Sequence, residues 1–250
     1  MRAGTELFYD VAMKTIGLIG GMSWESSAEY YRIINRETQR RCGGVHSARS
    51  LMLSVDFGAI EALQHVGDWD ALTVEMIAAA RALERGGADF VVLCTNTMHR
   101  MAGEMADGIA IPLLHIVDPT AEALKTAGVT TVGLLGTAFT MEQDFYKGRL
   151  AGHGFDVLVP GDEDRAAVHR IIYEELVRGD VRDESRAVYR DVIARLVEAG
   201  AEAIILGCTE IMLLVRPEDS AVPLFDTTTL HALAAVDLAL EQNIGRPEAR

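Results

Sequence analysis

The sequence has few of the features that mark secreted or membrane-spanning proteins. Only 3 of its 250 residues are cysteine, an odd number that is too small for a disulfide framework. No apolar run approaches the roughly 18–20 residues that cross a bilayer. Glu6 and Asp10 stand where a signal peptide has its apolar core. We therefore expect a cytoplasmic protein whose cysteines are free thiols.

Positive charge is also scarce. The chain has 23 Lys and Arg residues against 37 Asp and Glu residues, which gives a net charge of −14. Because its arginines are scattered, nucleic acid and anionic membrane surfaces are poor candidates as partners. The three cysteines and seven histidines match no zinc-binding spacing, so we expect no metal site. With 49% hydrophobic and 24% charged residues, the composition is that of a packed globular protein.

From residue 13 onward, short apolar segments alternate with amphipathic ones. The apolar segments predict strands at 14–19, 51–55, 90–93, 113–116, 131–135, 156–159 and 203–206. The amphipathic segments predict helices at 24–41, 70–85, 95–107, 121–127, 141–151, 165–178, 185–199 and 229–240. In the first helix, Ser26 and Glu29 are spaced as a capping box. The alternation predicts an α/β fold whose parallel sheets are covered on both faces and bind ligands at the carboxyl ends of the strands.

Three motifs of the first half recur in the same order in the second half. Segments 16–20, 87–95 and 111–114 match segments 132–136, 200–209 and 222–225. Apolar strands and glycine turns recur in α/β proteins by composition alone, but three matches in register favour duplication. The repeat predicts two similar Rossmann-like lobes, related by a pseudo-two-fold axis, with the active site in the cleft between them. The expected ranges are a disordered leader at 1–12, a first lobe at 13–115 plus 223–250, and a second lobe at 116–222.

Cys94 and Cys208 are equivalent in the repeat, and each lies where an apolar strand ends and a threonine-containing turn begins. Taken singly, a cysteine at such a place is usually a small buried hydrophobe. Two thiols that face each other across a cleft can invert a carbon centre, because one removes a proton from one face while the other delivers a proton to the opposite face. We therefore interpret the pair as catalytic. Cys42 has no counterpart in the repeat, and we interpret it as incidental.

The turns after the two cysteines consist of residue types that bind anions, namely Thr95, Asn96 and Thr97 after Cys94, and Thr209 and Glu210 after Cys208. Backbone N–H groups and hydroxyls at the start of a helix hold a carboxylate. Asn96 is placed to neutralise charge that develops on a substrate carboxylate as the α-proton leaves. Thr97 and Thr209 either hold the same group or cap their helices. Glu210 either orients or repels the substrate.

Other candidate residues have two interpretations each. The turn at 20–23 either contacts a ligand or is only a tight connection, and it matches no nucleotide-binding motif. Asp56 and Gln64 either touch a substrate or serve as a cap and a surface residue. His115 either reaches the cleft or belongs to the core, and we expect His99 to be a packed or capping residue.

Four motifs resemble the aspartate/glutamate racemase family, most closely its bacterial branch of broad-specificity amino-acid racemases. They are IGLIGGMSWE at 16–25, VLCTNTMH at 92–99, MEQDFY at 141–146 and GCTEI at 207–211. The resemblance implies a homodimeric, PLP-independent enzyme without a cofactor. Such an enzyme interconverts L- and D-amino acids (aspartate, glutamate or a broader set) by a two-base mechanism. The family's catalytic thiols correspond to Cys94 and Cys208, and its substrate contacts correspond to Met22, Gln64, Thr95, Asn96 and Thr209.

One segment departs from the family's pattern. Aspartate-specific members place an arginine just after the second strand, whereas residues 56–63 here contain no Lys or Arg, which argues against strict aspartate specificity. Three rival functions remain. The first is a related carbon-acid enzyme of the hydantoin racemase or maleate isomerase type. The second is a thiol redox protein in which Cys94 and Cys208 form a disulfide, and the third is a module that binds an amino acid without turnover.

Overall fold

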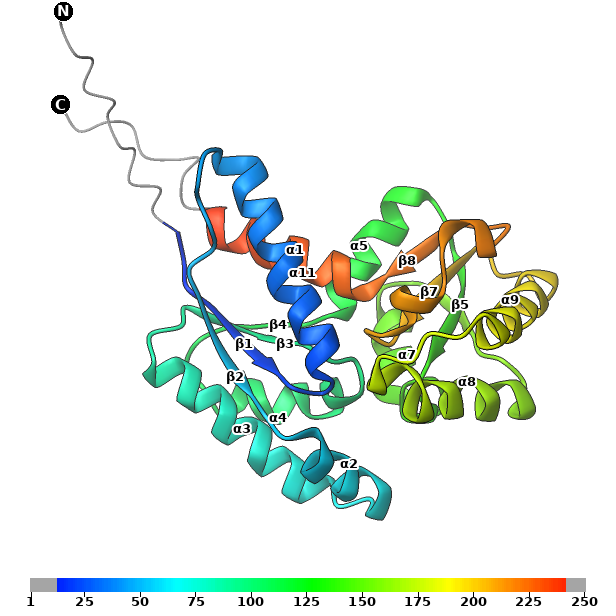
Figure 1. Ribbon diagram of the computed structural model, residues 1–250, viewed down its shortest axis with the longest axis horizontal. Coiled ribbons are helices and arrows are strands. Elements are labelled where there is room, and N and C mark those ends of the chain that lie inside the picture. The colour runs from blue at the N-terminus through cyan, green and yellow to red at the C-terminus, as the bar shows by residue number, and fades with distance from the viewer. Residues whose placement is uncertain (1–12, 242–250) are drawn as a thin grey trace, which may run out of the picture.

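A computed structural model describes residues 13–241, so the predicted leader at 1–12 lies outside the described residues. Within this range the chain forms two parallel four-stranded sheets (Figure 1). The first sheet has the order β2-β1-β3-β4 and contains β1 (Ile16–Gly20), β2 (Ser50–Ser54), β3 (Phe90–Leu93) and β4 (Leu113–Leu114). The second has the order β6-β5-β7-β8 and contains β5 (Thr131–Gly136), β6 (Asp156–Leu158), β7 (Ala203–Gly207) and β8 (Leu224–Asp226).

The two sheets repeat one topology, since β1 to β4 occupy the same places in the first sheet as β5 to β8 in the second. This confirms the prediction of an α/β fold with two similar lobes. The predicted strands lie within a few residues of the observed ones. Because every strand is parallel to its neighbours, all carboxyl ends of a sheet lie at one edge.

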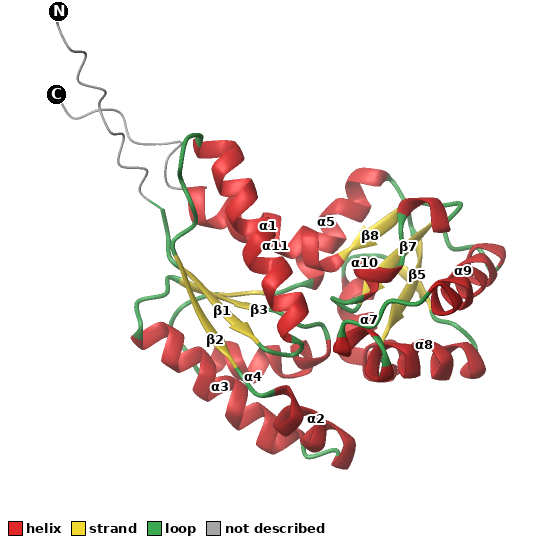
Figure 2. Cartoon of the chain, viewed as in Figure 1, coloured by secondary structure: helices red, strands yellow, loops and turns green. Residues whose placement is uncertain are grey.

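Helices cover both faces of each sheet (Figure 2). The helices of the first half are α1 (Trp24–Cys42), α2 (Phe57–Val66), α3 (Trp69–Arg85), α4 (Ala102–Asp107) and α5 (Val117–Ala127). The helices of the second half are α6 (Ala138–Glu142), α7 (Asp144–Gly152), α8 (Asp162–Glu174), α9 (Asp183–Glu198), α10 (Ile211–Leu214) and α11 (Thr227–Leu240). Short 3-10 helices span Thr97–Met101, Leu176–Arg178 and Pro217–Asp219.

The core of the first lobe has two layers, one on each face of the sheet. On one face, Leu18 of β1 packs with Tyr30 of α1 and Val236 of α11. On the other face, Ile19 of β1 packs with Met76 of α3. Successive strand residues point to opposite faces, so a continuous apolar run such as β1 supplies both layers.

Two helices cross between the lobes. Helix α5 follows β4 of the first sheet, but Val117 and Leu124 of this helix pack with Val132 and Leu134 of the second. Helix α11 follows β8 of the second sheet, but it packs on α1 of the first lobe. The predicted ranges place β8 in the first lobe, whereas β8 pairs with β7 in the second sheet. We therefore propose that the chain returns to the first lobe between Asp226 and Thr227.

The sequence patterns missed several short elements and misplaced one cap. Helix α2, helix α10 and strand β8 were not predicted. The predicted capping box from Ser26 to Glu29 is wrong, because helix α1 begins at Trp24 and Ser26 is already inside its first turn. Its N-cap is Ser23, whose Oγ accepts a hydrogen bond from the backbone N–H of Ser26 at 3.5 Å.

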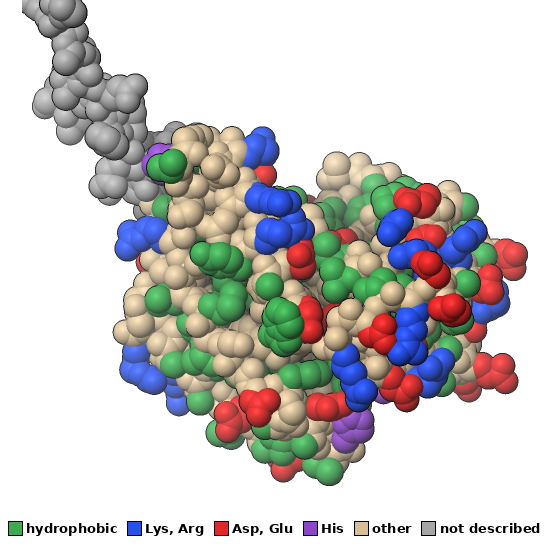
Figure 3. All heavy atoms as spheres, in the orientation of Figure 1, with side chains coloured by type: hydrophobic (Ala, Val, Ile, Leu, Met, Phe, Trp, Pro, Cys, Tyr) green, Lys and Arg blue, Asp and Glu red, His purple; other side chains and the backbone are tan. Residues whose placement is uncertain are grey.

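On the face shown in Figure 3, the second lobe carries positively and negatively charged side chains intermixed. Arg195 pairs with Asp164 at 2.7 Å, and Arg186 pairs with Asp183 at 2.5 Å. Such exposed pairs contribute little to stability, about 0–1 kcal/mol each. Among residues 13–241, no helix combines the length and apolarity that a membrane span requires.

Candidate active site

Residues that follow the carboxyl ends of strands, together with residues of helices α2 and α8 and the 3-10 helix Leu176–Arg178, enclose a small cavity between the lobes. The first lobe contributes Met22, Phe57, Gln64, Thr95, Asn96 and Thr97, and the second contributes Thr137, Ile172, Tyr173, Val177, Cys208 and Glu210. The cavity has a volume of about 20 Å³, which is room for one water molecule. Seven of the nine predicted site residues line it, and the two that do not are Cys94 and Thr209.

The turn after β1 brings Met22 and Ser23 to this cavity. Gly21 has φ +97°, and a Cβ at this position would lie 2.2 Å from the backbone oxygen of Val55. Only glycine fits so close to the neighbouring strand. Of the two interpretations of this turn, the tight connection is therefore present, and it places Met22 in the cavity wall.

Glu210 is the most heavily bonded side chain of the site. Its Oε1 accepts hydrogen bonds from Ser23 Oγ at 2.7 Å and from Ser23 N at 3.3 Å. Its Oε2 accepts hydrogen bonds from Cys208 Sγ and Thr209 Oγ1, both at 3.0 Å. The carboxylate is only 2% exposed, and these four donors stabilise its charge. Because Ser23 belongs to the first lobe, the carboxylate also connects the two lobes.

Cys208 is held in the thiol form by its surroundings. Burial is the largest cause, and the negative charge of Glu210 and the hydrogen bond to it add to the effect, so the pKa of the Cys208 thiol lies well above its ordinary value. Backbone N–H groups of Thr209 and Glu210 act in the opposite direction. The Cys208–Glu210 pair therefore joins an acid and a proton acceptor within hydrogen-bond distance.

Cys94 lies in a different environment from Cys208. It is fully buried in the apolar layer that contains Tyr30 and Val236, and its Sγ has only a weak contact with the oxygen of Val92 at 3.9 Å. Burial raises the pKa of this thiol as well. The repeat-equivalent cysteines are thus unlike, since Cys208 lines the cavity beside a carboxylate and Cys94 packs into the core.

Asn96 and Thr97 place polar groups in the cavity wall. Thr227 donates its hydroxyl to the oxygen of Leu206 at 2.9 Å, so it accepts from Asn96 Nδ2 at 3.1 Å. This chain fixes the orientation of the amide, and Asn96 Oδ1 is buried without a hydrogen-bond partner among the described residues. Thr97 Oγ1 lies 3.0 Å from Thr137 Oγ1 of the second lobe. Thr97 therefore joins the lobes and also begins a 3-10 helix.

Aromatic side chains cover the cavity between α2 and α8. Tyr173 donates its hydroxyl to Gln64 Oε1 at 2.9 Å, and its ring stacks on Phe57 with a centroid distance of 6.4 Å. His65 and His169 flank the ring of Tyr173 at 5.8 Å and 4.7 Å. Neither Tyr173 nor Phe57 was predicted as a site residue.

The remaining candidate residues have structural roles. Asp56 caps helix α2 through the N–H of Gly58 at 3.1 Å. His99 is packed as predicted, with Nδ1 bonded to the oxygen of Thr95 at 2.7 Å and Nε2 accepting from Ile116 N at 3.1 Å. His115 is buried, and burial together with the charge of Arg149 lowers its pKa to about 3.

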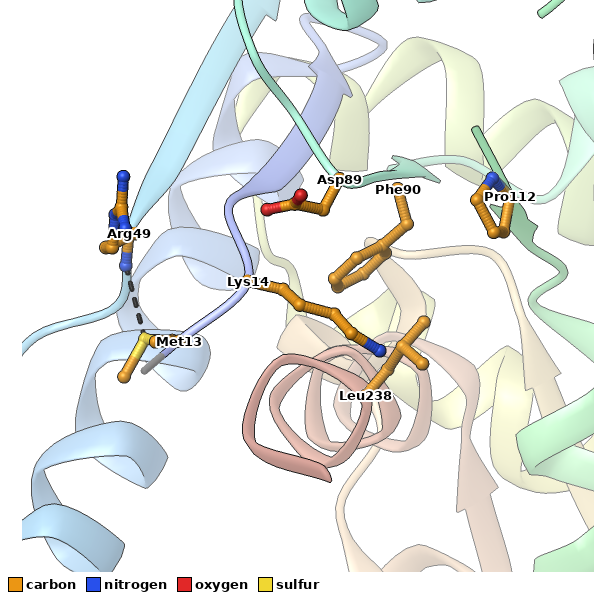
Figure 4. Close-up of a pocket in the computed structure, with 7 residues that line it drawn as sticks. All are labelled: Met13, Lys14, Arg49, Asp89, Phe90, Pro112 and Leu238. Atoms are coloured by element: carbon orange, nitrogen blue, oxygen red, sulfur yellow. Dashed lines mark hydrogen bonds between the residues drawn. The ribbon is translucent and has the colours of Figure 1, made fainter. Parts of the chain in front are cut away.

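A wider hollow of about 460 Å³ lies at the other edge of the first sheet (Figure 4). Its lining includes Lys14, Arg49, Asp89 and Pro112, which precede the strands rather than follow them. Ligands of parallel sheets bind at the carboxyl ends, so this hollow is the weaker candidate. Among residues 13–241, no group of three or more His, Cys, Asp and Glu residues is arranged to hold a metal ion.

Ser23 and Tyr173 are two of the site residues that sequence reasoning missed, in addition to Phe57 and other lining residues of the cavity. Ser23 directly follows the Gly-Gly-Met turn, and that turn is the only signal that pointed to it. Tyr173 falls inside a predicted helix, where a buried aromatic residue reads as core. Both owe their roles to contacts with the opposite lobe, over 187 and 109 residues of sequence.

A model of the family described as Asp/Glu/hydantoin racemase matches residues 19–235. The chain belongs to this family. A Yersinia pestis protein provisionally assigned as an Asp/Glu racemase is 52% identical, with a TM-score of 0.85 over 91% of this chain and 100% of that one. An aspartate racemase homologue from Pyrococcus horikoshii OT3 is 34% identical, with a TM-score of 0.77 over 91% of this chain and 99% of that one.

The broad specificity amino-acid racemase RacX of Bacillus subtilis is 27% identical over 173 residues, which are 69% of this chain and 74% of RacX. Membership of the family supports an amino-acid racemase, which is an isomerase.

Proposed function

We propose that the protein racemises amino acids without a cofactor, by two-base proton transfer at the α-carbon, in the cavity between the lobes. The observation that carries the proposal is the Cys208–Glu210 pair, with 3.0 Å between Sγ and Oε2, in a cavity lined by both lobes. A thiol beside a proton acceptor is the arrangement that generates a thiolate inside a buried site.

The proposed proton transfers start from the thiol form of Cys208. The S–H proton of Cys208 passes to Glu210 Oε2, and the thiolate then takes the α-proton of the substrate. The electron pair of the broken C–H bond delocalises into the substrate carboxylate. The thiol of Cys94 delivers its proton to the opposite face of the α-carbon, and a proton returns from Glu210 to Cys94 through solvent after product release.

In this proposal Cys94 must move to reach the substrate. Its Sγ now packs in the apolar layer, although its backbone lies directly at the carboxyl end of β3, next to the cavity residue Thr95. The cavity of about 20 Å³ must also widen before an amino acid can enter. We therefore propose that parting of the lobes opens the cavity, and that the side chain of Cys94 separately turns out of the first lobe's apolar layer toward it.

The turn after β3 supplies the groups for the substrate's carboxylate and ammonium. Asn96 keeps one amide proton and the unpaired acceptor Oδ1. Thr95 and Thr97 add hydroxyls from the same turn. Donors at the carboxylate stabilise the charge that develops there as the α-proton leaves, which lowers the barrier to its removal.

Exchange of the α-proton in D2O tests the proposal. A panel of L-amino acids is incubated with the protein without added PLP, and deuterium at Cα and chirality are followed by NMR and chiral chromatography. Cys208→Ala and Cys94→Ala variants should each lose racemisation, while one of them retains exchange without inversion. Cys42→Ala is the matched control and should behave as wild type.

Two results would contradict the proposal: no α-exchange with any amino acid, or full racemisation by both single variants. A disulfide between Cys94 and Cys208 under mild oxidant, together with absent exchange, would favour the redox alternative instead. We also propose that the protein is a cytoplasmic homodimer, and light scattering after gel filtration measures its mass in solution.

A further inference from the structure

Gln64 and Tyr173 come from opposite lobes and bond to each other over the cavity. Gln64 lies on α2, Tyr173 lies on α8, and the hydroxyl of Tyr173 donates to Gln64 Oε1 at 2.9 Å. Both side chains line the cavity of about 20 Å³, so an amino acid cannot enter while this bond and the stack of Tyr173 on Phe57 persist.

The Nε2 group of Gln64 is buried without a strong hydrogen-bond acceptor among the described residues. Gln64 is only 4% exposed, and its Nε2 donates to Met98 Sδ at 3.4 Å. A thioether sulfur only accepts hydrogen bonds, and does so weakly, so Nε2 must face Met98 and Oε1 must face Tyr173. A ligand with a better acceptor therefore improves the bonding of this amide, because burying a donor without a good partner costs free energy.

The walls beside this pair are apolar, and the charge within the cavity is negative. Phe57, Ile172 and Val177 line it next to Tyr173, and Glu210 is the one charged residue in its described lining. A second substrate carboxylate would be buried near Glu210 with no opposing Lys or Arg in that lining, which is unfavourable for like charges.

We propose that Gln64 and Tyr173 determine side-chain specificity, and that the substrates are amino acids with an uncharged side chain that has an apolar stem and a hydrogen-bonding end. The stem packs against Phe57, Ile172 and Val177. The end takes over the hydrogen bonds that Gln64 and Tyr173 now make to each other. This inference rests on the proposed racemase activity and adds the class of side chain.

Glutamine, glutamate and norleucine test the proposal, because the first two differ at the end of the side chain by an amide in place of a carboxylate and norleucine has no polar end. We expect kcat/KM for α-exchange to be at least about tenfold higher for glutamine than for glutamate, and several-fold higher than for norleucine. A tenfold ratio corresponds to about 1.4 kcal/mol of transition-state binding.

Variants of the pair separate recognition from a merely structural role. Gln64→Met and Tyr173→Phe keep the size of the side chain and remove its polar end. Each should therefore lower kcat/KM for glutamine about tenfold, mainly through a higher KM, and leave kcat/KM for norleucine unchanged. Gln64→Lys should raise kcat/KM for glutamate relative to kcat/KM for glutamine. Tyr189→Phe is the matched control, because Tyr189 is buried in the second lobe and does not line the cavity.

The outcomes distinguish this proposal from the proposed function. If no amino acid exchanges its α-proton, the racemase proposal falls, and the specificity proposal falls with it. The racemase proposal stands and only the specificity proposal is overturned by either of two results. One is a kcat/KM for glutamate that equals or exceeds that for glutamine. The other is an equal fall in kcat/KM for glutamine and norleucine in Gln64→Met and Tyr173→Phe.

Discussion

Ser23 and Glu210 are 187 residues apart in the sequence, and the hydroxyl of Ser23 donates a hydrogen bond to Glu210 Oε1 at 2.7 Å. Ser23 caps helix α1 of the first lobe, while Glu210 follows β7 of the second. The other carboxylate oxygen of Glu210 accepts from Cys208. The contact between the lobes is therefore part of the same hydrogen-bond chain as the thiol.

Glu210→Gln should lower the pKa of Cys208, because the charge and the hydrogen bond of Glu210 both raise it. The thiolate of Cys208 would then form at lower pH, and a shift of one pH unit corresponds to about 1.4 kcal/mol. NMR of protein labelled at cysteine ¹³Cβ measures the titration directly. The exposed Glu163→Gln is the control, and a titration identical in the wild type and Glu210→Gln would contradict the assignment.

Ser23→Ala should weaken both the closure of the lobes and the proton transfer. It removes the shortest donor to Glu210 and the cap of α1, so we expect the free energy of unfolding to fall by about 1–2 kcal/mol. The racemisation rate should fall about tenfold, because the carboxylate loses its fixed orientation beside Cys208.

Two further variants separate these effects of Ser23. Ser23→Gly removes the same hydroxyl, while glycine costs a helix cap only a few tenths of a kcal/mol, so its activity should match that of Ser23→Ala. Ser26→Ala alters a neighbouring buried serine that does not touch Glu210, and its activity should match the wild type. Wild-type activity in Ser23→Gly would refute the role of the hydroxyl.

Three buried histidines should make the protein less stable in acid. Burial lowers the pKa of His99, His115 and His231 below 6.5, so each is neutral in the folded protein but takes up a proton when unfolded in acid. Stability is therefore fully present above about pH 6.5 and is lost progressively as the pH falls from there to the folded pKa values. Each group contributes a slope of up to about 1.4 kcal/mol per pH unit.

Urea unfolding at pH 7 and pH 5.5 measures this loss. His231→Gln should reduce the difference in unfolding free energy between pH 7 and pH 5.5 by about one third. The exposed His46→Gln should leave that difference unchanged. If the difference in unfolding free energy is the same in the wild type and in both variants, other groups govern acid stability.

Gly21→Ala should destabilise the turn that carries Met22 and Ser23. A Cβ would lie 2.2 Å from the oxygen of Val55, and φ is +97°, so we expect a loss of about 2–4 kcal/mol. Gly103→Ala is the matched control, because no atom lies within 4 Å of that Cβ and alanine favours the helix there. Thermal unfolding compares the two variants, and equal melting temperatures would contradict the argument.

The sequence predicted the lobes and most of the cavity because both depend on local patterns. Apolar strands that end in glycine or threonine turns establish which residues reach the carboxyl edge, and the repeat indicates that two such edges exist. Cys208, Asn96 and Glu210 were found in this way. The burial of Cys94 depends on how α1 and α11 pack on the first sheet, and the contacts of Ser23 and Tyr173 depend on how far the lobes approach each other. No local pattern encodes either.

The crossing of α5 and α11 between the lobes has a consequence for the origin of the molecule. A half-length ancestor with the topology of either lobe would have carried its last helix away from its own sheet. That ancestor would have needed a second copy to return a helix to the uncovered face, as in domain-swapped dimers. Gene fusion would then have tied together two subunits that were already exchanging helices, so that neither half of the present chain is a self-sufficient folding unit.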